Sequence, residues 1–197
     1  MKRLLVFITI FILMISSNAY CGYSYRDMPL NHVTYLVNCC KNYNIDIETA
    51  VAILFIENPY LNNNIVNKNN DGTYDYGYFQ INTVNVKGLL RVTKTKDIQD
   101  PYDNILCGVY LMYSNKNKLN AYGISVNPFT SAFMHHRPGE IVKFKNNKSF
   151  NAIGYKYSVK AYVIYSYIKK LRKENSSNDP IDIYTLIMQV QNIMKGG

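Results

Sequence analysis

The stretch of residues 47–56 constrains the fold more than any other part of the chain, because it is apolar on nearly every side of the helix that it predicts. Asp46 is a suitable N-cap for this helix, and Glu48 places a negative charge in its first turn. Pro59 ends the helix and disfavours helical backbone at Asn58. A helix without a polar face must be buried on most sides, so the sequence predicts a central helix surrounded by other elements.

The rest of the chain predicts a mainly α domain with one long polar stretch. Residues 62–75 are rich in Asn and contain the turn signal Asp71-Gly72, so we expect a long loop or small hairpin there. With 197 residues, 48% of them hydrophobic, the chain can build one domain with a sizeable core and is too apolar to be disordered. Apolar spacing and amphipathic character predict further helices at 31–43, 103–113, 129–136, 156–172 and 181–195.

Residues 1–19 have the pattern of a signal peptide. A basic start is followed by the apolar segment 4–15, which is too short for a helix of roughly 20 residues across a bilayer. A small-x-small pattern then predicts cleavage after Ala19, with an uncleaved anchor as the alternative. A lipoprotein acylated at Cys21 is a weaker alternative, because Tyr20 is bulky for the position before such a cysteine. We therefore expect an exported protein, in the periplasm or associated with the cell envelope.

After this segment we expect a domain over residues 20–172, and then a polar break and an amphipathic C-terminal helix over residues 173–197. The whole chain has 22 Lys and Arg against 13 Asp and Glu, a formal net charge of +9. Removing Lys2 and Arg3 with the leader leaves 20 basic and 13 acidic residues, or +7. A basic protein favours an anionic partner, and export makes a cell-wall polymer or anionic lipid a better candidate than nucleic acid.

The cysteines leave two interpretations open. In an oxidising compartment a disulfide could join Cys39 or Cys40 to Cys107, and the alternative is that these are buried thiols. There is no C-x-x-C motif, so neither a zinc knuckle nor a thioredoxin-type site is supported.

Glu57 is the residue that points to chemistry, because it follows the most hydrophobic helix of the chain. Burial of a carboxyl group raises its pKa and keeps it protonated nearer to neutral pH. Such a group can donate a proton to a poor leaving group, such as a glycosidic oxygen. The alternative is a glutamate that simply reaches solvent at the end of its helix.

Two segments and one tyrosine resemble the lytic transglycosylases, the SLT domains of the lysozyme-like superfamily. Residues 67–82 read N-K-N-N-D-G-T-Y-D-Y-G-Y-F-Q-I-N, and residues 100–111 read D-P-Y-D-N-I-L-C-G-V-Y-L. Tyr157 resembles the tyrosine that opens the last helix of that domain. The pattern is most similar to the small secretion- and invasion-associated type. The resemblance implies a lysozyme-like α(+β) domain whose central helix ends in a catalytic Glu57.

The resemblance also implies a substrate and a mechanism. The enzyme would cleave the bond between N-acetylmuramic acid and N-acetylglucosamine in peptidoglycan, with Glu57 first as acid and then as base, to leave 1,6-anhydro-muramic ends. The alternatives are a lysozyme-type hydrolase that also uses Asp75, and a non-catalytic peptidoglycan-binding or scaffold descendant. The resemblance implies no cofactor and no metal, a monomer, and glycan strands as the partner, with a secretion-apparatus or envelope protein as a further candidate.

The family pattern supplies graded site candidates and two departures. Asn58 stands where the family usually has Ser, and we expect it to orient the carboxylate of Glu57. Met134 and His135 replace a Tyr and an Asn of the family, so either the sugar subsites differ there or this copy is weakened. Adjacent histidines seldom point the same way, so His135 and His136 do not predict a metal site. The residues expected to bind substrate or shape the cleft are Gln80, Tyr157, Gly77, Tyr78, Asn82 and His135. The alternatives are an unusual backbone angle at Gly77, a place in the core for Tyr78, and a purely structural role for Asn82 between the loop and the next helix.

Overall fold

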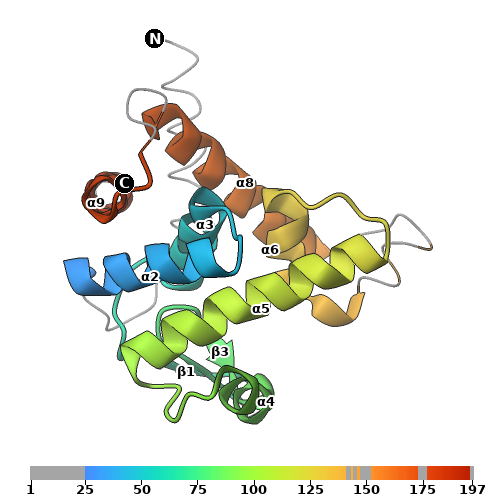
Figure 1. The fold of residues 1–197 in the computed structure, drawn as a ribbon. Helices are drawn as coiled ribbons and strands as arrows, with labels where there is room; N and C mark the ends of the chain where they lie inside the picture. The colour runs from blue at the N-terminus through green and yellow to red at the C-terminus, as the bar shows by residue number, and fades with distance from the viewer. Residues whose placement is uncertain (1–24, 141–142, 144–145, 147–151, 173–176, 196–197) are drawn as a thin grey trace.

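The computed structural model describes residues 25–140, 143, 146, 152–172 and 177–195. In this part of the chain helices surround one central helix, and a small sheet lies at one side (Figure 1). The fold is mainly helical, as predicted. The elements are α2 (Leu30–Asn42), α3 (Ile47–Glu57), β1 (Val66–Lys68), β2 (Tyr74–Tyr76), β3 (Ile81–Asn82), α4 (Thr83–Thr93), α5 (Pro101–Ala121), α6 (Pro128–His136), the 3-10 turn η1 (Pro138–Glu140), α8 (Ala152–Arg172) and α9 (Pro180–Lys195).

The central helix is α3, and its residues 47–55 are all buried. The Asp46 side chain caps the helix by accepting from the Thr49 backbone N–H at 3.0 Å. Helices α2, α6 and α8 pack around α3, which Figure 1 shows in teal between them. The apolar pattern therefore had the predicted consequence: the helix is enclosed, and Glu57 is its last residue.

The polar stretch forms a three-stranded antiparallel sheet in the order β1-β2-β3. Its first hairpin turns at Asp71-Gly72, where Gly72 has φ +83° and Asp71 accepts from the Thr73 backbone N–H at 3.0 Å. The prediction of a small hairpin is confirmed, with β3 as an additional strand. In the middle strand Asp75 pairs with Asn67 on one side and Asn82 on the other.

Three helices differ from the prediction. Helix α8 begins at Ala152, earlier than the expected residue 156. Helix α4 was not predicted; it is rich in β-branched residues, contains Gly88 and buries only Leu89. Helix α5 begins earlier than predicted, since Asp100 caps it and Pro101 suits its first turn. It also extends through the polar residues 114–121, which lack a regular apolar pattern.

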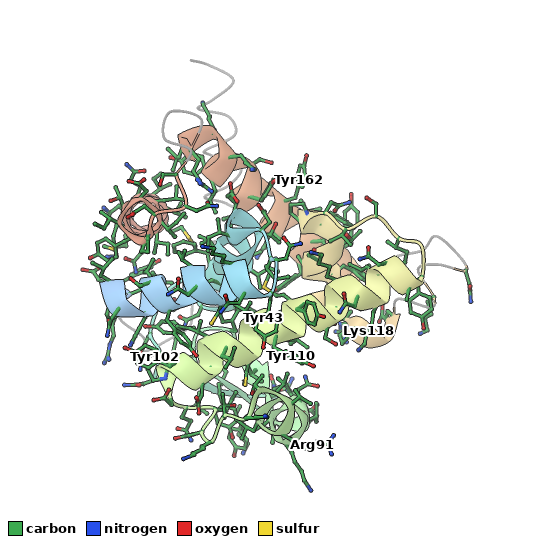
Figure 2. All side chains as sticks on the ribbon, viewed as in Figure 1. Tyr43, Arg91, Tyr102, Tyr110, Lys118 and Tyr162 are labelled. Carbon is green, nitrogen blue, oxygen red and sulfur yellow. The ribbon has the colours of Figure 1, made fainter. Side chains whose placement is uncertain are left out.

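Tyrosines fill the interface between α2 and α5 in a chain that has no Trp. The rings of Tyr43 and Tyr110 meet edge to face with centroids 5.7 Å apart, and those of Tyr35 and Tyr102 do the same at 5.2 Å. Figure 2 labels Tyr43, Tyr102 and Tyr110 along this interface. Edge-to-face packing suits the charge distribution of aromatic rings and adds stability beyond the buried area.

The three cysteines of this region are buried free thiols: Cys39 and Cys40 on α2, and Cys107 on α5. Of the two interpretations that the sequence left open, the structure therefore has the thiols and no disulfide between these residues. The predicted signal peptide, residues 1–19, and Cys21 lie outside the described residues. No helix among the described residues has both the length and the apolar character that a membrane span requires.

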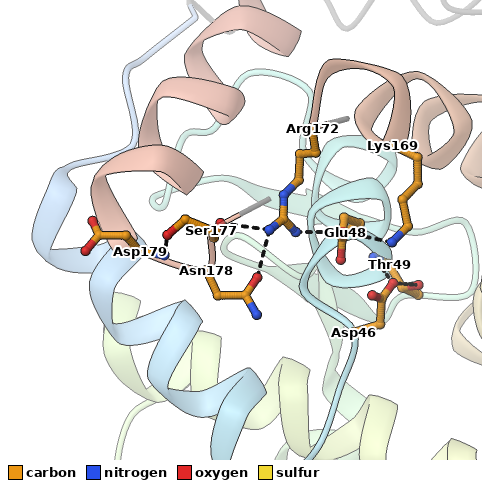
Figure 3. A network of polar contacts seen from close by, with 8 residues as sticks. All are labelled: Asp46, Glu48, Thr49, Lys169, Arg172, Ser177, Asn178 and Asp179. Atoms are coloured by element: carbon orange, nitrogen blue, oxygen red, sulfur yellow. Dashed lines mark hydrogen bonds and ion pairs between the residues drawn. The ribbon is translucent and has the colours of Figure 1, made fainter. Parts of the chain in front are cut away.

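A polar network fixes α8 against the start of α3 (Figure 3). Glu48 is 8% exposed at its side chain and pairs with Arg172 at 2.6 Å and Lys169 at 3.0 Å. Burial alone would raise the pKa of Glu48, but its hydrogen bonds and these cations hold it below the ordinary value. Arg172 also donates to Ser177 and Asn178 in the segment before α9. The far end of α8 is thereby anchored, while its beginning faces the end of α3.

The predicted C-terminal helix forms as α9 and packs on α2 and α8. Its buried side includes Ile183, Ile187 and Val190. The segment at the beginning of the described chain contacts this helix through two hydrogen bonds. Gln191 Nε2 donates to the Arg26 carbonyl at 2.6 Å, and the Tyr25 hydroxyl donates to the Met194 carbonyl at 3.2 Å.

Candidate active site

A cleft of about 1890 Å³ runs past the end of α3. The sheet, the end of α6, one side of α8 and the last residues of α9 all contribute to its lining. Among the lining residues are Glu57, Asp75, Gln80, His135 and Tyr157. Five residues that the sequence singled out, from five different elements or loops, therefore lie along one concave surface.

Glu57 lies at the bottom of this arrangement, with its side chain 16% exposed. The Tyr157 hydroxyl on α8 donates a hydrogen bond to Glu57 Oε1. Nε2 of His135, at the end of α6, is 3.4 Å from the same oxygen. Among the described residues no hydrogen bond reaches Oε2, which leaves that oxygen as the atom available to a ligand in the cleft.

The environment decides the protonation states of these three groups. Burial raises the pKa of Glu57 from 4.5 to about 8; the Tyr157 hydrogen bond acts against this rise and the charge of Asp75 adds to it. Burial lowers the pKa of His135 to about 4, so its ring is neutral at physiological pH. Burial and the neighbouring Glu57 raise the pKa of Tyr157 well above 10. The cleft therefore holds a protonated carboxyl, a neutral imidazole and a phenol that keeps its proton.

Asp75 is fixed by hydrogen bonds to both of its carboxylate oxygens. Asn69 Nδ2 donates to Oδ2 at 3.0 Å, and Asn82 Nδ2 donates to Oδ1 at 2.8 Å. Asn82 also caps α4, because its Oδ1 accepts from the Val84 backbone N–H at 3.0 Å. Asn82 thus connects the sheet to the next helix and holds Asp75 at the same time.

Gln80 lines the cleft in a left-handed backbone conformation, with φ +44°. Its Oε1 accepts from Asn67 Nδ2 at 2.5 Å, and its Nε2 donates to the Gly77 carbonyl at 2.7 Å. Both ends of the amide are therefore bonded to the protein, and the side chain closes the loop between β2 and β3.

Comparison with protein-family models matches residues 36–136 to the transglycosylase SLT domain. The chain belongs to this family. Members of this family are peptidoglycan lytic transglycosylases. Membership therefore gives the chain this enzyme class, with peptidoglycan in general as its substrate. The matched region contains Glu57, the sheet and α5, and it ends at His136. No curated protein and no solved structure matched the chain.

In this SLT domain the segment 67–82 packs against the segment 100–111, and Gly77 lies at their contact. Gly77 has φ +69°, and a Cβ atom there would lie 2.6 Å from the Asn104 amide. Gly77 is not among the residues that line the cleft, and its close approach is to Asn104. Of the two interpretations of Gly77, the structure has the unusual backbone angle and not the contact with glycan. A Cβ on Gly108 would similarly lie 2.3 Å from the ring of Phe79.

The expectation that Tyr78 binds substrate is also wrong. Its side chain is fully buried, and its hydroxyl is hydrogen-bonded to His32 Nδ1 at 2.9 Å. It belongs to the core of the SLT domain and cannot stack on a sugar. Alternation of aromatic residues in the motif did not reveal which rings face inward.

Asn58 does not orient Glu57 either. Its amide is fully buried, donates to the Asn62 carbonyl at 2.8 Å and accepts from the Asn62 backbone N–H at 3.2 Å. It closes the turn after α3, and the residues that hold Glu57 come from α6 and α8.

Sequence reasoning missed one residue and one contact that build this site. Asn104 is buried, accepts from the Phe79 backbone N–H at 3.0 Å and donates to the Tyr76 carbonyl at 2.9 Å, so it ties the sheet region to α5. Its presence in the 100–111 motif was the available signal. The contact between His135 and Glu57 had no signal in the sequence. Among the described residues no group of three or more His, Cys, Asp or Glu side chains could hold a metal ion.

Proposed function

We propose that Glu57 cleaves the β-1,4 bond between N-acetylmuramic acid and N-acetylglucosamine without water. Glu57 Oε2 donates its proton to the glycosidic oxygen, and the bond from that oxygen to C1 of muramic acid breaks. The substrate's own N-acetyl group stabilises the developing cation. The C6 hydroxyl then attacks C1 and gives its proton to the Glu57 carboxylate. The products are a free hydroxyl on N-acetylglucosamine and a 1,6-anhydro ring on muramic acid.

Glu57 supports this reaction because it is protonated near neutral pH while Oε2 carries no hydrogen bond from the described residues. A pKa of about 8 lies near the operating pH, which suits a group that must first give a proton and then accept one. The bond from Tyr157 to Oε1 stabilises the carboxylate that forms between these steps. His135 is neutral and lies beside the same oxygen, so we assign both as positioning residues for Glu57.

The contacts of Asp75 fit both the transglycosylase and the hydrolase. Both of its oxygens accept hydrogen bonds, from Asn69 and Asn82, and a carboxylate held in this way can serve in either reaction. Its charge raises the pKa of Glu57 and so helps to keep the acid protonated. We propose that this electrostatic effect is its role, with Gln80 and Asn82 shaping the cleft wall around it.

Mass spectrometry of the muropeptides released from purified peptidoglycan tests the reaction. We expect products that end in 1,6-anhydro-muramic acid, lighter by one water than reducing sugars. Glu57→Gln should bind peptidoglycan and release nothing, whereas Asp75→Asn should give the same anhydro products at a lower rate. Reducing ends would show a hydrolase, and turnover by Glu57→Gln would remove Glu57 from the mechanism. Binding by the unmodified protein with no release would favour a scaffold.

We further propose that the protein is exported by its residues 1–19 and acts as a monomer on peptidoglycan in the periplasm or at the envelope, without a cofactor. The net charge of +7 after Ala19 supports attraction to an anionic wall polymer. Membership of the small secretion-associated type, and a secretion-apparatus partner, stay predictions. N-terminal sequencing of the mature protein and localisation of a tagged chain would test export.

A further inference from the structure

The side of α8 that faces the cleft carries two lysines next to the proposed catalytic group. The lining residues Ile153, Lys156, Tyr157 and Lys160 follow a helical spacing of three and four, so they share one face of α8. Tyr157 holds Glu57, and Lys160 lies about 4.5 Å further along the helix axis. Both lysines therefore line the cleft on the same face of α8 as Tyr157, the residue that bonds Glu57.

Within the described part of the chain, neither lysine has a carboxylate partner. The ion pairs among the described residues involve Lys169, Arg172, Lys195 and His135, and none includes Lys156 or Lys160. Like charges four residues apart on a helix destabilise each other. Burial and the charge of Lys156 lower the pKa of Lys160, which is half-buried. An anion in the cleft would offset both the repulsion between the two lysines and the burial of the Lys160 charge.

A third cation lies beside this pair. Arg137 follows α6 and lines the same cleft, and its Cγ atom lies 3.3 Å from the position of a Cβ on Gly154, in the first turn of α8. Its Nε atom is buried and has no hydrogen-bond partner among the described residues. A planar guanidinium matches the two oxygens of a carboxylate ligand.

We propose that Lys156, Lys160 and Arg137 form a subsite for the carboxylates of the peptide stem of peptidoglycan. The stem is attached to the same muramic acid whose C1 bond is cut, so its carboxylates enter the same cleft when the glycan lies there. The enzyme would then prefer peptide-bearing strands over strands stripped of their stems. This inference rests on the proposed function for the identity of the ligand.

The test measures binding in the Glu57→Gln background, so that no strand is cut during the measurement. The ligands are soluble glycan strands with intact stems and the same strands after an amidase has removed the stems, which leaves only the lactyl carboxylate. The variant is Lys156→Gln with Lys160→Gln. The matched control is Lys170→Gln, an exposed lysine of α8 that does not line the cleft.

We expect the double variant to weaken binding of stem-bearing strands about tenfold, the size expected for two partly exposed charge-assisted contacts, and binding of stripped strands less than twofold. The control should change neither, and added salt should weaken binding of the stem-bearing strands more than binding of the stripped strands. Equal loss on both strands, or no loss, would overturn the subsite. If the unmodified protein releases no muropeptides but the stem dependence holds, the proposed reaction fails and the subsite stands. If the protein releases muropeptides but shows no stem dependence, the proposed reaction stands and the subsite fails.

Discussion

Replacement of Glu57 by Gln should make the protein more stable at alkaline pH while it abolishes activity. The folded state raises the pKa of Glu57 from 4.5 to about 8, so between these values it holds a proton that the unfolded chain has released. Stability therefore falls as the pH rises through this window and levels off above the folded pKa. The full difference between the unfolded and folded pKa values corresponds to about 5 kcal/mol of unfolding free energy. The Glu57→Gln variant has no titrating group at this position and should not lose this stability as the pH rises.

Urea denaturation of both proteins across a pH series measures this effect. The difference between the two free energies of unfolding cancels the other titrating groups that the two proteins share. Between about pH 6.5 and about pH 9 the difference should shift by about 2 kcal/mol in favour of Glu57→Gln. The direction is determined by the raised pKa: a carboxyl with a lowered pKa would give no shift in this range.

Parallel pH profiles for the two proteins would refute the reasoning, because they would mean that Glu57 is already ionised in the folded state. A general acid with an ordinary pKa would be almost fully deprotonated at neutral pH. The proposed first step would then lack its proton, whatever the activity of the variant.

Three further predictions concern the groups around Glu57 and the supports of the site. The alkaline limb of the pH–rate profile should move to higher pH in Tyr157→Phe, which loses a bond that stabilises the carboxylate, and to lower pH in Asp75→Asn, which loses a charge that raises the pKa of Glu57. In thermal unfolding, Gly77→Ala should lose about 3 kcal/mol because its Cβ meets Asn104 at a positive φ, whereas Gly88→Ala, in open space within α4, should be neutral or stabilising by less than about 1 kcal/mol. Glu48→Gln should cost about 3 kcal/mol in urea denaturation at neutral pH, since it leaves the mostly buried Arg172 without its carboxylate, and the cost should shrink as the pH falls below the ordinary value of Glu48, 4.5.

The central helix and its terminal carboxylate could be predicted because burial on all sides leaves a direct trace in the sequence. Residues 47–55 are apolar with few exceptions, and only a position surrounded by other elements tolerates this. Helix α4 left no such trace, since it buries one residue and depends on its cap, Asn82. The same reasoning explains why the polar end of α5 was missed.

Contacts between distant elements were beyond sequence reasoning, because nothing local determines which faces meet. His135 contacts Glu57 only because α6 and α8 both pack on the end of α3. Tyr78 was assigned to substrate because it lies in a motif rich in site residues, although its ring turns into the core and bonds His32. The family resemblance indicated where the site is, and the packing decided which side chains reach it.

Contacts within the protein explain the spacing of several residues in the two motifs. Asn104 and Gly108 are four residues apart on one face of α5, where the first receives the loop at Gly77 and the second receives the ring of Phe79. The sheet is thereby fixed relative to α5, and it places Asp75 close enough to Glu57 to raise its pKa. Replacement of Asn104 should therefore change the pKa of Glu57, although Asn104 does not contact Glu57. Asn104 thus helps to set the electrostatic field in the cleft without lining it.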